Sequence, residues 1–133
     1  MILVDTNVLL DLVTDDPLWA EWSQQELARA AVDDELAIND IVYAELSVRY
    51  ARIEEVDAML RDTGLASTAM PRAALFLAGK VFQRYRSAGG VRTGVLPDFF
   101  IGAHAVISDA TLITRDARRY RTYFPSIMLI SPN

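Results

Sequence analysis

Two short apolar runs near opposite ends of the chain each lead into an aspartate. Residues 1–4 precede Asp5, and residues 112–114 stand two positions ahead of Asp116. Runs this short, bounded by polar residues, are typical of buried strands in a parallel sheet. Longer helical patterns alternate with them, which predicts an α/β fold. Because ligands of open parallel sheets bind at the carboxyl ends of the strands, both aspartates are expected at that edge.

Capping signals and periodicity place the remaining elements. Asp16-Pro17 is typical of a helix start, Asp40 is expected to cap a further helix, and Gly64 is typical of a helix end. A flexible loop is expected at residues 88–94, and no linker divides the chain. The sequence therefore predicts one domain over residues 1–133, a three-layer α/β/α sandwich with a mostly parallel central sheet. The predicted strands are 1–4, 36–39, 112–114 and 127–130, and the predicted helices are 7–13, 17–32, 41–50, 53–63, 71–87, 97–107 and 117–121.

Four acidic residues stand in or beside apolar patterns, where a folded chain seldom leaves carboxylates without a positive partner. We call Asp5, Glu45, Asp98 and Asp116 the acidic quartet. Carboxylates gathered into one pocket repel each other, and burial raises the cost of their charge, so they must protonate or bind a cation. Mg²⁺ and Mn²⁺ prefer oxygen ligands. A divalent-metal site is therefore predicted if the quartet converges.

Each member of the quartet also has a structural interpretation. Asp5, Asp98 and Asp116 could each cap or stabilise the first turn of a helix. Glu45 points to the apolar side of its helix but could pair with Arg49, one turn further on. Taken singly, these interpretations compete with a metal site. The set favours a shared site, because each acid has an independent reason to approach one edge of the sheet.

The motifs around the quartet resemble those of PIN-domain ribonucleases. They are Val4-Asp5-Thr6-Asn7-Val8, Tyr43-Ala44-Glu45-Leu46, Leu96-Pro97-Asp98-Phe99-Phe100-Ile101-Gly102-Ala103-His104-Ala105 and Leu112-Ile113-Thr114-Arg115-Asp116. Each motif is weak alone, but the four in this order and spacing are fairly specific. The resemblance covers essentially the whole chain and is closest to the VapC toxins of bacterial and archaeal toxin–antitoxin pairs.

The resemblance implies an endoribonuclease that depends on Mg²⁺ or Mn²⁺ and uses the acidic quartet to hydrolyse RNA phosphodiesters. Asp5 and Asp98 are expected to bind the catalytic ion most directly. Asp116 would act through water or at a second ion, and Glu45 would orient the attacking water. No side-chain nucleophile is needed, which agrees with the absence of cysteine and of a Ser/His/Asp set.

Two threonines also match the family pattern, and one helix departs from it. Thr6 and Thr114 stand at hydroxyl positions that support the pocket in the family, by hydrogen bonds to the carboxylates or to water. Phe99, Phe100 and His104 make their helix bulkier than the small-residue version common in the family. This departure bears on groove shape and substrate preference rather than on the quartet.

Charge is divided unevenly along the chain, although the total is only −5. Residues 1–62 hold 15 acidic and 4 basic residues, net −11, and residues 63–133 hold 3 acidic and 9 basic residues, net +6. Such asymmetry indicates an anionic partner for one face, or a solvated surface with uneven charge. The candidate RNA-binding residues are Arg84, Arg86, Arg92, Arg115, Arg118, Arg119 and Arg121.

Several other classes of protein are disfavoured. The chain has no cysteine for thiolate sites, its single histidine cannot build a zinc site alone, and no glycine-rich turn follows the first strand. Asn7 stands where a haloacid-dehalogenase-type phosphatase would want a second aspartate. The remaining rival is a non-catalytic PIN-like module that binds RNA or a protein partner.

The resemblance also implies partners and a location. The expected partners are an RNA substrate, a VapB-like antitoxin and a second copy of the chain in a homodimer. The apolar start lacks the features of a targeting signal, and the apolar stretch at residues 95–107 is too short to span a bilayer. A soluble, cytoplasmic protein without membrane contact is therefore expected.

Overall fold

Five short parallel strands form the centre of the fold in this computed structural model, which describes residues 1–91 and 94–132. They are β1 (Ile2–Val4), β2 (Leu36–Ile38), β3 (Ala66–Ser67), β4 (Thr111–Ile113) and β5 (Leu129–Ile130). Their order across the sheet is β3-β2-β1-β4-β5. Leu3 of β1 is in register with Ala37 on one side and Leu112 on the other, and all three side chains are buried. The first strand of the chain is thus the central one.

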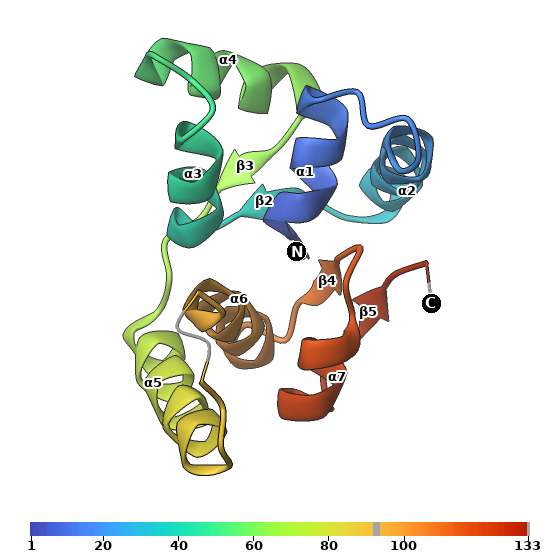
Figure 1. Ribbon diagram of the computed structural model, residues 1–133. Coiled ribbons are helices and arrows are strands. Elements are labelled where there is room, and N and C mark those ends of the chain that lie inside the picture. The colour runs from blue at the N-terminus through green and yellow to red at the C-terminus, as the bar shows by residue number, and fades with distance from the viewer. Residues whose placement is uncertain (92–93, 133) are drawn as a thin grey trace.

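Helices cover both faces of this sheet. They are α1 (Thr6–Val13), α2 (Ala20–Asp33), α3 (Asp40–Ser47), α4 (Ile53–Thr63), α5 (Arg72–Ser87), α6 (Leu96–Ile107) and α7 (Arg118–Tyr123). The strand order reverses direction after β3, so right-handed crossovers place α1–α4 on one face and α5–α7 on the other. Figure 1 shows this grouping, with the blue and green helices on one side and the yellow to red helices on the other. The predicted three-layer α/β/α sandwich with a parallel sheet is confirmed.

Several helix boundaries differ from the sequence prediction, including that of the last helix, which is predicted at residues 117–121 and runs from Arg118 to Tyr123. The second helix begins at Ala20 rather than after Asp16, whose carboxylate instead accepts hydrogen bonds of 2.9 Å from the backbone N–H of Leu18 and of Trp19 and closes a separate turn. Asn39, not Asp40, caps α3, accepting a 3.0 Å bond from the N–H of Val42. That helix ends at Ser47, earlier than the predicted residue 50.

The edges of the sheet also differ from the prediction. Strand β3 was not predicted, because its two residues carry no alternating pattern and are defined only by pairing with β2. Strand β5 covers only the last two residues of the predicted 127–130. By contrast, α4 matches its predicted range, and Gly64 ends it in the left-handed conformation, with φ of 72°. The predicted loop at residues 88–94 includes residues 92 and 93, which lie outside the described residues.

Helix α6 packs closely against the ring of Phe124, the residue that follows α7, at the position of Gly102. A Cβ atom at Gly102 would lie 2.5 Å from two ring carbons of Phe124, whose side chain is buried. The close approach of α6 to this ring therefore requires a residue without a side chain.

We expect Gly102→Ala to destabilise the protein by about 1–3 kcal/mol, the usual cost of overpacking a core. Gly79→Ala is the matched control, since nothing lies within 4 Å of a Cβ built on this residue of α5. Because alanine has the higher helix propensity, Gly79→Ala should leave the stability unchanged or raise it by about 0.5–1 kcal/mol. Urea unfolding measures both, and a Gly102→Ala variant as stable as the wild type would contradict the packing argument.

Candidate active site

Asp5 lies at the carboxyl end of β1 and is the most buried member of the quartet. Its Oδ1 accepts a 2.7 Å hydrogen bond from the N–H of Thr6, so it caps α1. Its Oδ2 accepts bonds from the hydroxyls of Thr114, at 2.8 Å, and Tyr120, at 2.9 Å. Burial, and then the charge of Asp98, raise the pKa of Asp5 to about 7, although the three hydrogen bonds oppose the rise. This carboxylate therefore has both the predicted capping role and an environment unfavourable to its charge.

Glu45 is held in place by the residue that follows Asp5. The hydroxyl of Thr6 donates a 2.6 Å hydrogen bond to Oε1 of Glu45, which links α1 to α3. The alternative partner, Arg49, forms no ion pair with it in the part of the chain that the structure describes. Glu45 is half-buried on the side of α3 that faces the rest of the quartet.

Asp98 lies in the first turn of α6 and has a cationic partner. The guanidinium Nη1 of Arg119, on α7, donates a hydrogen bond to its Oδ2. Burial raises the pKa of the Asp98 carboxyl, and the charges of Glu45 and Asp116 add to the rise, while Arg119 opposes it. Sequence reasoning placed both Asp98 and Arg119 near the site but did not predict that they pair.

Thr114 and Asp116 bring the end of β4 to the same place. The hydroxyl of Thr114, which is buried, bonds to Asp5 and also accepts a 3.1 Å hydrogen bond from the backbone N–H of Asp116. The Asp116 side chain is exposed and accepts a 3.4 Å bond from the N–H of Arg118 at the start of α7. Asp116 therefore stands at the open rim of the group, whereas Asp5 forms its floor.

The quartet thus gathers at the carboxyl edge of β1 and β4, but its carboxylates do not close on one point. Within residues 1–91 and 94–132, no three acidic or histidine side chains lie close enough together to hold a metal ion. In this arrangement Arg119 is bonded to Oδ2 of Asp98, and three donors are bonded to Asp5.

The predicted RNA-binding arginines fall into different surroundings. Arg118 and Arg119 line a pocket of about 410 Å³ together with Asp116, Thr122 and Tyr123. Arg84 and Arg86 are exposed in the last turn of α5. Arg121 reaches Ser131, its Nη2 lying 3.3 Å from the hydroxyl oxygen. Arg92 lies outside the described residues.

Arg115 has a structural partner in the core. Its Nε donates a 3.1 Å hydrogen bond to Oδ2 of Asp11, which is 2 % exposed and also accepts a 2.8 Å bond from the hydroxyl of Ser23. The guanidinium lies over the ring of Trp19, 5.5 Å from its centroid. Asn7 accepts a 3.1 Å bond from the backbone N–H of the same arginine. These contacts favour a role for Arg115 in fixing the segment that follows β4.

Sequence reasoning missed Tyr120 and Asp11 as residues of this region. Tyr120 is 2 % exposed, and its hydroxyl reaches Asp5 from a helix that otherwise reads as basic and solvated. The signal was available, because Tyr120 is the aromatic residue one turn after Asp116 and marks the inner face of α7. Asp11 gave no comparable signal, since its partners are distant in sequence.

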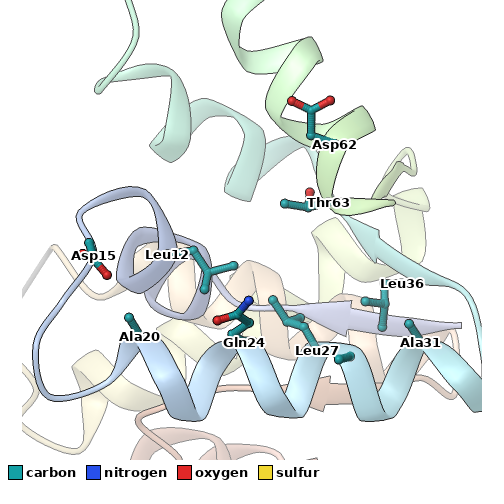
Figure 2. Close-up of a pocket in the computed structure, with 10 residues that line it drawn as sticks. Leu12, Asp15, Ala20, Gln24, Leu27, Ala31, Leu36, Asp62 and Thr63 are labelled. Carbon is teal, nitrogen blue, oxygen red and sulfur yellow. The ribbon is translucent and has the colours of Figure 1, made fainter.

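A larger cavity lies away from the quartet. It measures about 560 Å³ and is formed between α1, α2 and the end of α4. Figure 2 shows Asp62 and Thr63 of α4 on one side of it and Gln24 and Leu27 of α2 on the other. None of its lining residues belongs to the quartet, so it is not part of the candidate active site.

The family of the chain follows from comparison with known proteins. A family model for the PIN domain matches residues 2–125, and the chain therefore belongs to the PIN domain family. No curated protein sequence gives a significant match.

Solved structures with the same fold come from VapBC toxin–antitoxin complexes. VapBC2 of Rickettsia felis, bound to a DNA fragment from its promoter, has a chain that superposes with a TM-score of 0.75 at 22 % identity, covering 100 % of both chains. VapBC-1 of nontypeable Haemophilus influenzae gives 0.72 at 20 % identity, covering 98 % of both. A DNA-bound VapBC of Salmonella typhimurium gives 0.68 at 17 % identity, again covering 98 % of both. At these identities the likeness establishes the fold.

Proposed function

We propose that this protein is a metal-dependent endoribonuclease of the VapC type, with the acidic quartet as its catalytic group. The observation that carries the proposal is the environment of Asp5. A carboxylate that is 5 % exposed, holds three hydrogen bonds and has a pKa raised to about 7 beside a second carboxylate is costly to keep without function. A purely structural cap of α1 needs no second carboxylate beside it.

The donor set fits a hard divalent cation in its chemistry. The four members of the quartet are all carboxylates, and oxygen donors suit Mg²⁺ or Mn²⁺. The charge of Asp98 raises the pKa of Asp5, and the charges of Glu45 and Asp116 raise that of Asp98, so a cation shared among them would relieve the repulsion. Asp5, Asp98 and Asp116 would hold the ion, which when bound supplies Lewis-acid polarisation of the phosphoryl group and activation of water.

The neighbouring residues fix the carboxylates and the substrate. Thr114 and Tyr120 hold Asp5 through its Oδ2, which leaves it a single orientation. Thr6 holds Glu45 through Oε1, and we assign Glu45 the role of orienting the attacking water. Arg118 and Arg119 lie beside Asp116, where they would bind RNA phosphates.

Partners and location follow from the same proposal. The three solved structures described above are VapBC complexes, which supports a VapB-like antitoxin as partner of this chain and a toxin role within such a pair. We also propose a homodimer and, because the substrate is RNA, a cytoplasmic location. No helix in the described residues is long and apolar enough to cross a bilayer.

Cleavage of a structured RNA pool by purified, antitoxin-free protein tests the function, with Mg²⁺, Mn²⁺ or EDTA added. We expect cleavage that requires metal and that falls by at least about a hundredfold in Asp98→Asn, because losing a residue that only supports a metal ligand already costs 10–100-fold. Asp109→Asn is the matched control, since it makes the same change at an exposed residue just beyond the other end of α6. RNA binding without metal-dependent turnover would instead identify a non-catalytic PIN-like module.

A further inference from the structure

Arg119 occupies the place beside Asp98 where the proposed metal ion would be needed. The side chain of Arg119 is 24 % exposed and that of Asp98 is 35 % exposed, so the pair stands at the mouth of the site. The next residue, Tyr120, is buried and bonded to Asp5, which fixes the backbone of α7 at this point. The fold therefore holds the backbone of Arg119 beside the quartet.

This arginine supplies the positive charge that the quartet otherwise lacks. Among the described residues, the Arg119–Asp98 pair is the one ion pair that involves a quartet member. The charges of Glu45 and Asp116 raise the pKa of Asp98, and the charge of Asp98 raises the pKa of Asp5. Neutralising Asp98 therefore reduces the repulsion within the quartet. A guanidinium carries a single charge and reaches one carboxylate here. A divalent cation could be shared but would compete for the same oxygen of Asp98.

A pocket lies next to the ion pair. It measures about 410 Å³ and is bordered by Asp116, Arg118, Arg119, Thr122 and Tyr123. Arg118 is exposed there. An arginine side chain can turn from Asp98 into this pocket by rotating its χ angles, without movement of the helix. A phosphate in the pocket would then meet two guanidinium groups, each of which can donate charge-assisted, bidentate hydrogen bonds to phosphate oxygens.

We propose that Arg119 has two alternative partners, Asp98 in the metal-free protein and an RNA phosphate in the adjacent pocket once a divalent cation has displaced it. This inference rests on the proposed metal-dependent function. It makes the pocket a phosphate subsite that is completed only when the metal is bound. Cation binding and phosphate binding are then coupled, and by linkage each strengthens the other.

Calorimetric titration with Mn²⁺ alone tests the competition in antitoxin-free protein. Arg119→Gln should bind Mn²⁺ about three- to fivefold more tightly than the wild type, because a partly exposed ion pair no longer has to be broken. Arg118→Gln is the matched control. It removes the same charge from the same pocket but leaves the ion pair, so its affinity should change by no more than about twofold. Arg119→Lys should fall between, and thermal melting checks that each variant is folded.

A second measurement follows the arginine itself. The Nε–H resonance of Arg119, assigned by its absence in Arg119→Gln, should shift when Mg²⁺ is added. A nucleoside 5′-monophosphate should then shift the Arg118 and Arg119 resonances further with Mg²⁺ present than without it. Equal responses with and without Mg²⁺ would overturn the phosphate part of the proposal.

The outcomes separate this inference from the proposed function. If the wild type cleaves RNA with Mn²⁺ but Arg119→Gln binds the ion no better than Arg118→Gln, the competition is refuted and the nuclease stands. If neither Arg119→Gln nor the wild type binds Mn²⁺, both proposals are refuted, because the quartet then fails to bind the ion even when the arginine that pairs with Asp98 has been removed.

Discussion

Asp5→Asn is expected to remove RNA cleavage while making the metal-free protein more stable at neutral and higher pH. The carboxyl of Asp5 has a pKa of about 7 in the folded protein, against 3.8 as its ordinary value. Between these values the folded state binds more protons than the unfolded state, so the free energy of unfolding falls as pH rises from about 4 to about 7. Above that range the full cost of ionising the buried group remains.

The size of this effect follows from the difference between the two pKa values. At about 1.4 kcal/mol for each pH unit, ionising Asp5 costs the folded state roughly 4 kcal/mol above pH 7. Asparagine cannot ionise and keeps an oxygen for the N–H of Thr6. The variant should therefore lose the part of the fall in stability that comes from Asp5, while Asp98, whose pKa burial also raises, still contributes its own part. A gain in stability with loss of activity is typical of a functional carboxylate.

Urea unfolding in EDTA at pH values from 4.5 to 8 measures the effect, read as wild type against variant at each pH. The comparison is needed because His104 also titrates in this range. Burial lowers its pKa, so it makes the protein less stable as pH falls, whereas Asp5 makes it less stable as pH rises. Asp109→Asn, at an exposed position with φ of 50°, should run parallel to the wild-type curve, with at most a small constant offset because asparagine tolerates the left-handed region. A variant less stable than the wild type at every pH would mean that Asp5 serves chiefly to cap α1.

Arg115→Gln is expected to destabilise the protein by about 3 kcal/mol, the lower end of the cost of leaving a buried charge without its partner. Asp11 is 2 % exposed and would keep only the hydroxyl of Ser23. The lower end applies because the Arg115 side chain is itself 33 % exposed. Arg84→Gln, at an exposed position of α5, should change the stability by no more than about 0.5 kcal/mol.

The double variant Asp11→Asn/Arg115→Gln distinguishes a lost pair from a lost arginine. Because it removes the buried charge together with its partner, it should recover part of the stability that Arg115→Gln loses. If the double variant is instead the sum of the two single variants, the Asp11–Arg115 contact contributes nothing to stability. Urea unfolding at pH 7 gives all the values needed.

The sequence predicted where most helices, strands and quartet residues lie in the fold, but it did not predict which side chains contact one another. Asp5 and Asp116 could be placed at one edge because strand ends in a parallel sheet share an edge, and local apolar runs reveal strands. Gly64 and Pro71 marked helix boundaries correctly because caps are local. Strand β3 could not be seen, since two residues define no period.

Side-chain partners between distant segments had no local signal. Arg115 and Arg119 look alike in the sequence, yet one pairs with Asp11 in the core and the other with Asp98 at the site. Which arginine is free depends on three-dimensional distances that periodicity does not contain. The family resemblance identified the quartet, but it could not reveal that Arg119 forms an ion pair with Asp98.

The hydrogen bonds to Asp5 join the two ends of the chain. Thr114 is 109 residues away in sequence and Tyr120 is 115 residues away. Until the segment from β4 to α7 is present, Asp5 lacks its hydroxyl donors and Asp98 lacks Arg119. No fragment that stops before Tyr120 can therefore hold Asp5 and Asp98 in the arrangement described here, so the candidate site forms only when sequence-distant segments have folded together.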